Sequence, residues 1–532
     1  MSKFNTRTAF PVGRGPIATE TQPSGATFQG APGFARDEKS ELFLLSVSNM
    51  VGESTFYENA TDRDDRFTGL VRAVAAADPD WLIRFAGWLR GTANMRSASL
   101  VLAAEGTKAL LESKQLGSRK LIGSVLQRAD EPGEFLAYWR THFGSKLPMP
   151  VKRGVADSVS RLYTERNIIK YNVAGKAVRF GTVVHATHPN LTPVLRYLLS
   201  LSKVSDVDIP DELGLLRANA EFVKSTPEQI KGWAQNGSLA EHLRTAGMTW
   251  EAVPSLVNGP WTRELWESII PSMGYMALLR NLRNLDQAEV SDVVAATVAA
   301  RLADPEQVAK SRQFPFRFYA AHKNVGSLRW GHALETGLRH SLSNVPALTG
   351  RTLVLVDQSP SMFPGPYYAG DASKSDIVFA EKAALFGSAL ALRCDHADLY
   401  GYGFRSYPVQ FRKGDAVLKT MEKFHVDDGT DTFGALQRHY ANHDRVVIVT
   451  DEQTAVNRQM ADPYLRRQYG LDKLGPFGAL VPAHVPVFTW NLCGYQYGHA
   501  TGPNWHTSGG LTDQAFSMIP LIEQGRDADW PF

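Results

Sequence analysis

The pattern of apolar and polar positions changes near residue 350. Before this point apolar residues recur at spacings of three and four, as in residues 80–90 (DWLIRFAGWLR) and 273–283 (MGYMALLRNLR). This spacing predicts amphipathic helices, each with one buried face. Strand-like alternation is nearly absent, and Gly, Pro or Asp mark the breaks between helices. Many short helices without strands can bury their apolar faces only on one another, which predicts an α-solenoid.

Beyond this point short apolar runs alternate with helical segments. Strands and helices are predicted at residues 352–356 (strand), 376–393 (helix), 397–404 (strand), 416–424 (helix), 445–450 (strand) and 485–490 (strand). This alternation predicts a doubly wound α/β domain with a parallel sheet. The first 35 residues are rich in Gly, Pro, Ser and Thr and are predicted to be a flexible arm. The predicted parts are therefore 1–35, 36–348 and 349–532, and the fold is mainly α.

Composition places the chain in a reducing compartment. Only two cysteines occur among 532 residues, Cys394 and Cys493, which argues against a disulfide framework and against a cysteine-rich zinc site. No run approaches the roughly 18 apolar residues that a membrane span needs. The N-terminal 25 residues contain no apolar signal-peptide core. We therefore expect a cytoplasmic protein without a membrane partner.

Charge is divided unevenly between the two halves. Residues from 351 onward carry 16 Lys or Arg and 20 Asp or Glu, whereas the first 350 carry 41 and 34. The basic excess is densest at 151–180, where seven Lys or Arg face only Asp157 and Glu165. A solvated helix surface explains such a run, and so does a phosphate-binding surface. Tyr163 and Phe180 lie within it and could stack on unpaired bases or belong to the core. Further basic clusters occur at 81–96 and 312–330.

Oxygen-bearing side chains follow three segments of the predicted sheet. The strand at 352–356 ends in Asp357-Gln-Ser359-Pro-Ser361, Thr430 follows a glycine turn, and Asp451 follows the strand at 445–450. Because carboxyl ends of parallel strands meet at one edge of a sheet, these five side chains are expected to converge. Carboxylate and hydroxyl oxygens suit a hard divalent cation, most simply Mg²⁺. A polar turn is the alternative for the first motif alone, but the three segments together favour a metal site.

No nucleophile and base are recognisable beside these residues. Asp451 and Glu452 are neighbours on one strand end, so their side chains point to opposite faces and make a poor acid–base pair. His499 and His506 fall in a Gly-rich segment and are expected at the surface. The cluster is therefore interpreted as a binding site, and no catalytic residue is assigned.

A long helical part followed by this oxygen cluster resembles the Ro 60 kDa autoantigen family, a TROVE module joined to a von Willebrand factor A domain. The five oxygen residues match that domain's metal-ion-dependent adhesion site. Segments 43–57 (FLL…GESTFY), 276–282 (MALLRNL) and 312–316 (RQFPF) also match. The resemblance implies a ring of HEAT-like repeats that takes single-stranded RNA ends, Y RNA on its outer surface, and a partnership with an exoribonuclease.

Two residues carry over directly from the family's RNA-contacting motifs. Lys170 matches the lysine of a K-Y-K segment, and His188 matches the histidine that closes an L-S-H segment. The family's arginine between them has no clean match, and Lys176 or Arg179 are expected to replace it. The full set of predicted RNA contacts is Arg166, Lys170, Lys176, Arg179, His188 and Arg312.

The sequence thus predicts a monomeric, non-enzymatic RNA-binding protein that acts in RNA quality control or processing within a ribonucleoprotein, and not on DNA. It would bind Y RNA and the 3′ ends of misfolded non-coding RNA. A different function is also open at this point: a metal-dependent adhesion or chaperone-like scaffold whose helical half binds protein. Phosphate contacts predict binding that weakens steeply with salt, which distinguishes the two.

Overall fold

The computed structural model describes residues 13–48, 51–173, 175–204, 207–257, 261–363, 377–455, 464, 467, 480–502 and 504–532. The chain forms two compact units. The sheet unit comprises Met1–Leu70, Phe314–Ala320 and Leu338–Phe532, and the helical unit comprises Val71–Gln313 and Ala321–Gly337. This division confirms the predicted fold class, a helical part and an α/β part, but it places the boundaries differently.

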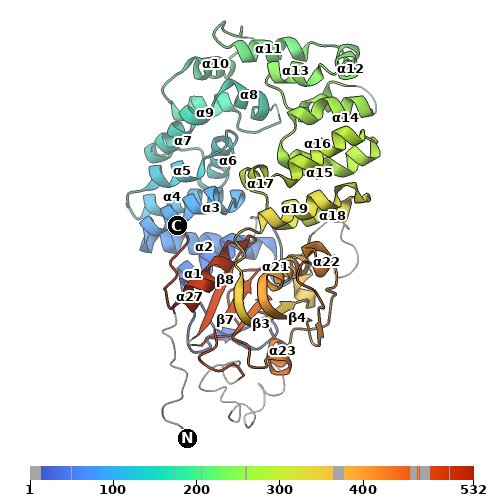
Figure 1. The fold of residues 1–532 in the computed structure, drawn as a ribbon. Coiled ribbons are helices and arrows are strands. Elements are labelled where there is room, and N and C mark those ends of the chain that lie inside the picture. The colour runs from blue at the N-terminus through green and yellow to red at the C-terminus, as the bar shows by residue number, and fades with distance from the viewer. Residues whose placement is uncertain are drawn as a thin grey trace. The chain divides into compact units, whose positions relative to one another are not determined.

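The helical unit is a succession of short helices, stacked in pairs (Figure 1). In chain order, including those that enter it from the sheet unit, they are α2 (Ala60–Ala77), α3 (Pro79–Gly91), α4 (Arg96–Glu112), α5 (Ser118–Val125), α6 (Glu131–Phe143), α7 (Met149–Leu162), α8 (Glu165–Tyr171), α9 (Phe180–Thr187), α10 (Pro193–Leu201), α11 (Gly214–Val223), α12 (Pro227–Gln235), α13 (Leu239–Thr245), α14 (Arg263–Ile269), α15 (Tyr275–Gln287), α16 (Asp292–Ala303), α17 (Pro305–Ser311), α18 (Pro315–Asn324) and α19 (Gly331–Ser341).

Helix α3 shows how the sequence defines these elements. Its N-cap, Asp78, accepts a hydrogen bond from the Trp81 amide, and Pro79 follows at the first helical position. Leu82, Phe85 and Leu89 recur at helical spacing and are fully buried. Each burial of this kind stabilises the fold by about 1.5–3 kcal/mol relative to an exposed side chain. Capping and periodicity therefore both specify the helix locally.

Two helices of this unit that are distant in sequence, α3 and α17, are joined at their ends by a hydrogen bond. Arg312, the residue after α17, donates through Nη1 to the carbonyl oxygen of Gly91 at the end of α3, at 2.6 Å. Arg312 adopts a left-handed backbone conformation there, with φ of 51°. The bond spans 221 residues of chain. It closes the succession of helices on itself, as expected for a ring.

The main sheet of the sheet unit has six strands among the described residues, in the order β5-β4-β3-β6-β7-β8 (Figure 1). They are β3 (Leu348–Asp357), β4 (Cys394–Tyr402), β5 (Ser406–Pro408), β6 (Arg445–Thr450), β7 (Val487–Asn491) and β8 (Trp505–Gly509). Only β5, an edge strand, runs antiparallel to its neighbour. The helices of this unit are α1 (Glu38–Ser48), α21 (Phe379–Arg393), α22 (Val417–Met421), α23 (Thr432–His439) and α27 (Met518–Glu523).

The predicted strands coincide with the core of this sheet. Strand β6 has the predicted bounds, whereas β3, β4 and β7 begin or end a few residues away from the predictions. Val354 and Leu355 of β3 are fully buried, as are Val449 and Ile448 of β6. The edge strands β5 and β8 were not predicted, because neither carries an apolar run and their pairing depends on strands distant in sequence.

The N-terminal residues correct the predicted domain boundaries. Residues 1–12 lie outside the described part, but residues 13–35 are not a free arm: β1 (Gly25–Ala26) pairs with β2 (Pro32–Gly33), and Phe34 pairs with Gly498. Ala31 and Phe34 are buried. Helix α1, predicted within 36–348, contacts β8 in the sheet unit. Nine of its residues are buried, so this helix is covered on all its faces, unlike a surface helix with one apolar face.

His506 of β8 is expected to make the stability of the sheet unit depend on pH. The side chain, predicted at the surface, is only 8% exposed, and its Nε2 lies 3.0 Å from Asn504 Oδ1. Burial lowers the pKa of His506 from 6.5 to about 4. The unfolded chain therefore takes up a proton at a higher pH than the folded chain does. As pH falls from about 6.5 to 4, His506 is expected to reduce the free energy of unfolding by about 2 kcal/mol.

Urea unfolding of wild type and His506→Gln at several pH values measures this effect. The variant should lose less stability than wild type between pH 6.5 and 4, because glutamine does not titrate. An identical dependence of unfolding free energy on pH in the two proteins would show that the imidazole is not excluded from protonation in the fold.

Within the described residues, no helix combines the length and apolar character needed to cross a bilayer.

Candidate metal site and nucleic-acid interface

The five predicted oxygen ligands come together at the carboxyl edge of the sheet. Asp357 ends β3, Asp451 follows β6, and Ser359, Ser361 and Thr430 lie on the loops between. Each of the five is at most 1% exposed. The Asp357 carboxylate accepts hydrogen bonds from the Ser359 amide at 2.9 Å and from the Thr450 hydroxyl at 2.6 Å. The first of these bonds shapes the turn that places the Ser359 and Ser361 hydroxyls side by side, 3.1 Å apart.

Burial leaves this cluster with uncompensated negative charge. Asp451 Oδ1 accepts from the Gln453 amide at 2.9 Å, whereas Oδ2 is buried and has no hydrogen-bond partner among the described residues. Burial, together with the charge of Asp357, raises the pKa of Asp451 to about 7. Burial also raises the pKa of Asp357 to about 6. A bound cation would neutralise both carboxylates and provide the partner that Asp451 Oδ2 lacks.

The spacing of the oxygens suits an octahedral ion. Bonds of about 2.1 Å at right angles place neighbouring ligand oxygens about 3.0 Å apart. The Ser359 and Ser361 hydroxyls share a hydrogen bond at 3.1 Å, so both oxygens could become neighbouring ligands with little movement. The donors are carboxylate and hydroxyl oxygens, the type that Mg²⁺ prefers. Among the described residues, no group of three or more His, Cys, Asp or Glu side chains forms an alternative metal site. The donor set therefore fits a hard divalent cation.

The helical unit contains an open cavity of about 800 Å³. Lys170 of α8 is one of its lining residues. The others lie in the segment before α14, around α15 and at the end of α17: Thr249, Trp250, Glu251, Ser272, Gly274, Tyr275, Met276, Ala277, Arg280, Asn281, Asn284, Ser311 and Gln313. Lys170 and Arg280 are exposed to solvent. Two cations and one carboxylate, Glu251, lie among amides, hydroxyls and an indole, a surface whose cationic part could bind phosphates and whose polar groups could bind base edges.

A second pocket of about 420 Å³ shares residues with this cavity. Three tryptophans line it, Trp250, Trp261 and Trp266, and the last two have ring centroids 4.5 Å apart. Asn281 and Asn284 belong to both linings. This pocket was not predicted from the sequence, although three tryptophans within 17 residues were a visible signal. Arg280 was not predicted either, because the helical pattern did not distinguish it from other exposed positions.

The predicted RNA contacts are divided between the cavity and other exposed positions. Lys170 lines the cavity, and Arg312 lies between two lining residues, Ser311 and Gln313. Outside the lining, the exposed members of the set are Arg166, Lys176, Arg179 and His188. Arg179 is the N-cap of α9 and His188 its C-cap, in a left-handed conformation with φ of 52°. Of the predicted set, the structure thus places only Lys170 in the cavity lining, while the Arg312 side chain donates to the Gly91 carbonyl.

Several other basic and aromatic residues have structural roles. Tyr163 and Phe180 are buried and stack on each other with ring centroids 4.0 Å apart, so they are not available to bases. Burial raises the pKa of the Tyr163 hydroxyl. In the basic cluster at 81–96, Arg90 and Arg96 both form ion pairs with Glu131. Positive charge in the sequence is here neutralised by carboxylates that only the fold brings close.

Comparison with known proteins assigns part of this chain to a domain family. Residues 243–350 match the TROVE domain. Telomerase protein component 1 of Mus musculus and of Rattus norvegicus are each 37% identical over 103 residues, which is 19% of this chain. The chain spans 4% of the length of these two relatives. The crystal structure of the Ro (Rsr) protein of Deinococcus radiodurans aligns with a TM-score of 0.58 and 18% identity, over 91% of this chain and all of that one.

Proposed function

The TROVE match and the fold of a Ro protein confirm the predicted resemblance to the Ro 60 kDa family, and on this premise we propose that the protein is a non-enzymatic RNA-binding protein. Its ligands would be Y RNA and the single-stranded ends of structured or misfolded non-coding RNA. It would act in RNA quality control or processing as part of a ribonucleoprotein. An exoribonuclease partner, a monomeric protein and a cytoplasmic setting complete the proposal.

The cavity of the helical unit is the observation that carries this proposal. Lys170 and Arg280 place two exposed cations on its lining. No ion pair to either side chain is found among the described residues, so both charges remain available to phosphates. Asn284 and Gln313 add two amides to the lining. Each NH₂ group donates one hydrogen bond within the protein, to Asn281 Oδ1 and to the Ser311 carbonyl, and keeps a second hydrogen that could be donated to a base edge. An RNA strand with unpaired bases uses both kinds of contact, whereas a duplex hides its base edges.

The tryptophan pocket supports an unpaired strand in particular. Trp250 lines both this pocket and the cavity, so a strand bound in the cavity could place a base against the indoles. Stacking of one base on an aromatic side chain contributes about 1–3 kcal/mol and tolerates any base. This favours a site that selects unpaired ends by their exposed bases and not by their sequence.

Four basic residues outside the cavity lining are the proposed contacts for Y RNA. Arg166, Lys176, Arg179 and His188 are exposed. Lys176 Nζ lies 3.7 Å from Glu134, and both side chains are substantially exposed, so this ion pair is weak and a phosphate could replace it. These residues carry the basic excess identified in the sequence at 151–180.

The oxygen cluster of the sheet unit is the proposed site of Mg²⁺. Asp357, Ser359, Ser361, Thr430 and Asp451 would hold the ion, some of them through water. The ion would neutralise two fully buried carboxylates, so it would stabilise the fold of the sheet unit.

Two buried free cysteines, Cys394 and Cys493, are compatible with the proposed reducing cytoplasm.

Binding of a labelled single-stranded RNA oligonucleotide, followed between 50 and 200 mM salt, tests the RNA proposal. Wild type should lose affinity steeply as salt increases. The double variant Lys170→Glu, Arg280→Glu should bind at least tenfold more weakly at 50 mM salt. Its salt slope should be shallower by about 1.4, because each single-strand phosphate contact contributes about 0.7.

A matched control reverses two charges away from the cavity lining. Lys224→Glu with Lys231→Glu changes two exposed lysines of the same unit by the same amount, and this variant should bind like wild type within about threefold. Equal losses in both double variants would show only a general charge effect. RNA binding by wild type that does not respond to salt, or is absent, would favour a protein-binding scaffold.

A further inference from the structure

A segment of the chain itself lies against the oxygen cluster. Three of the residues 27–30 contact the loop that follows Asp451. The Thr27 hydroxyl donates to the carbonyl of Thr454 at 2.8 Å, and the Phe28 amide donates to Gln453 Oε1 at 2.9 Å. Gly30 forms a β-bridge with Ala455. These contacts fix the backbone on both sides of Gln29.

Gln29 extends from this segment to one of the five oxygen residues. Its Nε2 lies 3.2 Å from Thr430 Oγ1 and 2.7 Å from Tyr57 Oη. Both neighbours are hydroxyls, which can donate or accept, so either end of the amide group can face them. A cation at the cluster would attract the carbonyl oxygen and repel the NH₂ group. The 3.2 Å separation is close to the roughly 3.0 Å expected between neighbouring ligands of an octahedral Mg²⁺.

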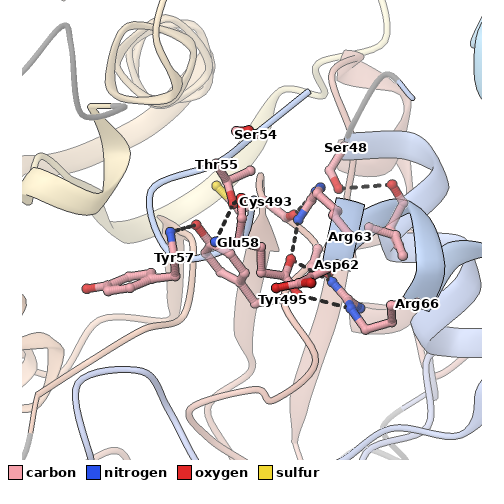
Figure 2. A network of polar contacts seen from close by, with 12 residues as sticks. Ser48, Ser54, Thr55, Tyr57, Glu58, Asp62, Arg63, Arg66, Cys493 and Tyr495 are labelled. Atoms are coloured by element: carbon pink, nitrogen blue, oxygen red, sulfur yellow. Dashed lines mark hydrogen bonds and ion pairs between the residues drawn. The ribbon is translucent and has the colours of Figure 1, made fainter. Parts of the chain in front are cut away.

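Tyr57 is fixed in place by the polar network of Figure 2. The Tyr57 amide donates to Tyr495 Oη at 3.5 Å, and the adjacent Glu58 carboxylate pairs with Arg63 at 2.7 Å and Arg66 at 2.9 Å (Figure 2). These two arginines also donate to the carbonyl oxygens of Cys493 and Gly494, in the loop after β7.

The network therefore fastens the segment around Tyr57 to the sheet unit. The ring of Phe28 stacks on that of Tyr57, with centroids 4.8 Å apart and the planes 2° from parallel. Two segments that both precede the helical unit in the chain thus hold Gln29 against Thr430. The contacts that hold these two segments to the sheet unit do not involve a bound ion.

We propose that Gln29 is a metal ligand: its side-chain carbonyl oxygen takes the coordination position beside Thr430, and the chain closes its own divalent-cation site. This inference rests on the proposed metal site and adds a residue from a segment that the sequence placed in a flexible arm. A site completed by an internal amide has no open position for the carboxylate of a protein partner. The same ligand makes the ion a link between residues 27–30 and the sheet.

Mn²⁺ serves as the probe, because bound Mn²⁺ reports its coordinated water through water-proton relaxation. Calorimetry on wild type should show one Mn²⁺ site, and Asp451→Asn should remove it. Gln29→Ala should weaken Mn²⁺ binding about tenfold and raise the relaxivity of the bound ion by the contribution of one water. Acetate should lower that relaxivity in Gln29→Ala, where a position is open, and leave wild type unchanged. Gln29→Glu should bind Mn²⁺ at least as tightly as wild type.

Gln22→Ala is the matched control, since Gln22 is exposed on the same N-terminal segment; it should match wild type in all three measurements. If wild type binds Mn²⁺ and loses it in Asp451→Asn, but Gln29→Ala keeps the affinity, relaxivity and acetate response of wild type, the role of Gln29 is refuted and the metal site stands. If wild type binds no Mn²⁺, both fail.

Discussion

Replacing Arg36 by Met is expected to lower the free energy of unfolding by about 3–5 kcal/mol, the range for breaking a buried ion pair. The Arg36 and Glu452 side chains are 0% and 1% exposed, and Arg36 Nη2 lies 2.5 Å from Glu452 Oε2. Asn491 Nδ2 donates to the same carboxylate oxygen at 2.5 Å. Methionine fills a similar volume, so the main effect is a buried carboxylate that has lost its counter-charge.

The double variant Arg36→Met, Glu452→Gln should recover much of this loss. Arg36 Nε and Nη1 are buried without hydrogen-bond partners among the described residues, so the intact pair is itself incompletely compensated. Urea unfolding of the two single variants and the double variant gives the coupling energy. Arg119→Met is the control: its ion pair with Asp157 is about half exposed on both sides, so its loss should have a much smaller effect on the free energy of unfolding.

Equal, small effects of Arg36→Met and Arg119→Met would contradict a stabilising contact between residue 36 and the sheet. The contact matters for the domain organisation, because Arg36 follows directly on the segment predicted to be a flexible arm. A loss of several kcal/mol would show that the N-terminal residues are part of the sheet unit's stability.

Asp451→Asn is expected to change stability in opposite directions with and without Mg²⁺. Without metal, the substitution removes one of two buried carboxylates while Oδ1 can still accept from the Gln453 amide. Burial and Asp357 raise the pKa of Asp451 to about 7, so its ionised form destabilises the fold at higher pH. At pH 8 the metal-free variant should therefore be more stable than wild type by about 1–3 kcal/mol.

With Mg²⁺ the order should reverse. Wild type gains about 4.1 kcal/mol when Mg²⁺ is present at 1,000 times its Kd, whereas the variant should gain nothing, because the ion loses a charged ligand. Thermal unfolding at pH 8 with Mg²⁺ or EDTA measures both effects. Asp529→Asn, at an exposed position of the same unit, should respond to Mg²⁺ as wild type does.

Two results would count against the site. A wild-type melting temperature that does not change with Mg²⁺ would argue against metal binding at the cluster. An Asp451→Asn variant that still gains stability from Mg²⁺ would place the ion elsewhere. Either result leaves the RNA proposal untouched, since the cavity lies entirely within residues of the helical unit.

The proposed cation site and the proposed RNA-binding cavity belong to different units of the chain. The five oxygen residues lie within the sheet unit, and every residue lining the cavity lies in the helical unit. The most recognisable motif in the sequence is therefore not the proposed site of the main ligand. Its proposed role is to hold together a unit whose N-terminal segments are distant in sequence from the sheet.

Local sequence determined the features that depend on neighbours along the chain. Periodic apolar residues specified the helices, as Leu82, Phe85 and Leu89 show in α3. A continuous apolar run specified β3, and the ligands Asp357, Ser359 and Ser361 followed from its end. Thr430 and Asp451 could be added because parallel strands share a carboxyl edge, a rule that applies without knowledge of side-chain contacts.

Only the tertiary structure decided which charges are neutralised and which segments cover the sites. Arg90 and Arg96 belong to a cluster that is basic in the sequence, but the fold pairs both of them with Glu131. Gln29 lies in a Gly- and Pro-rich stretch without periodicity, and its position beside Thr430 depends on contacts across 401 residues of chain. Such contacts arise from packing of distant segments, and they leave no repeat, run or spacing in the sequence from which they could be predicted.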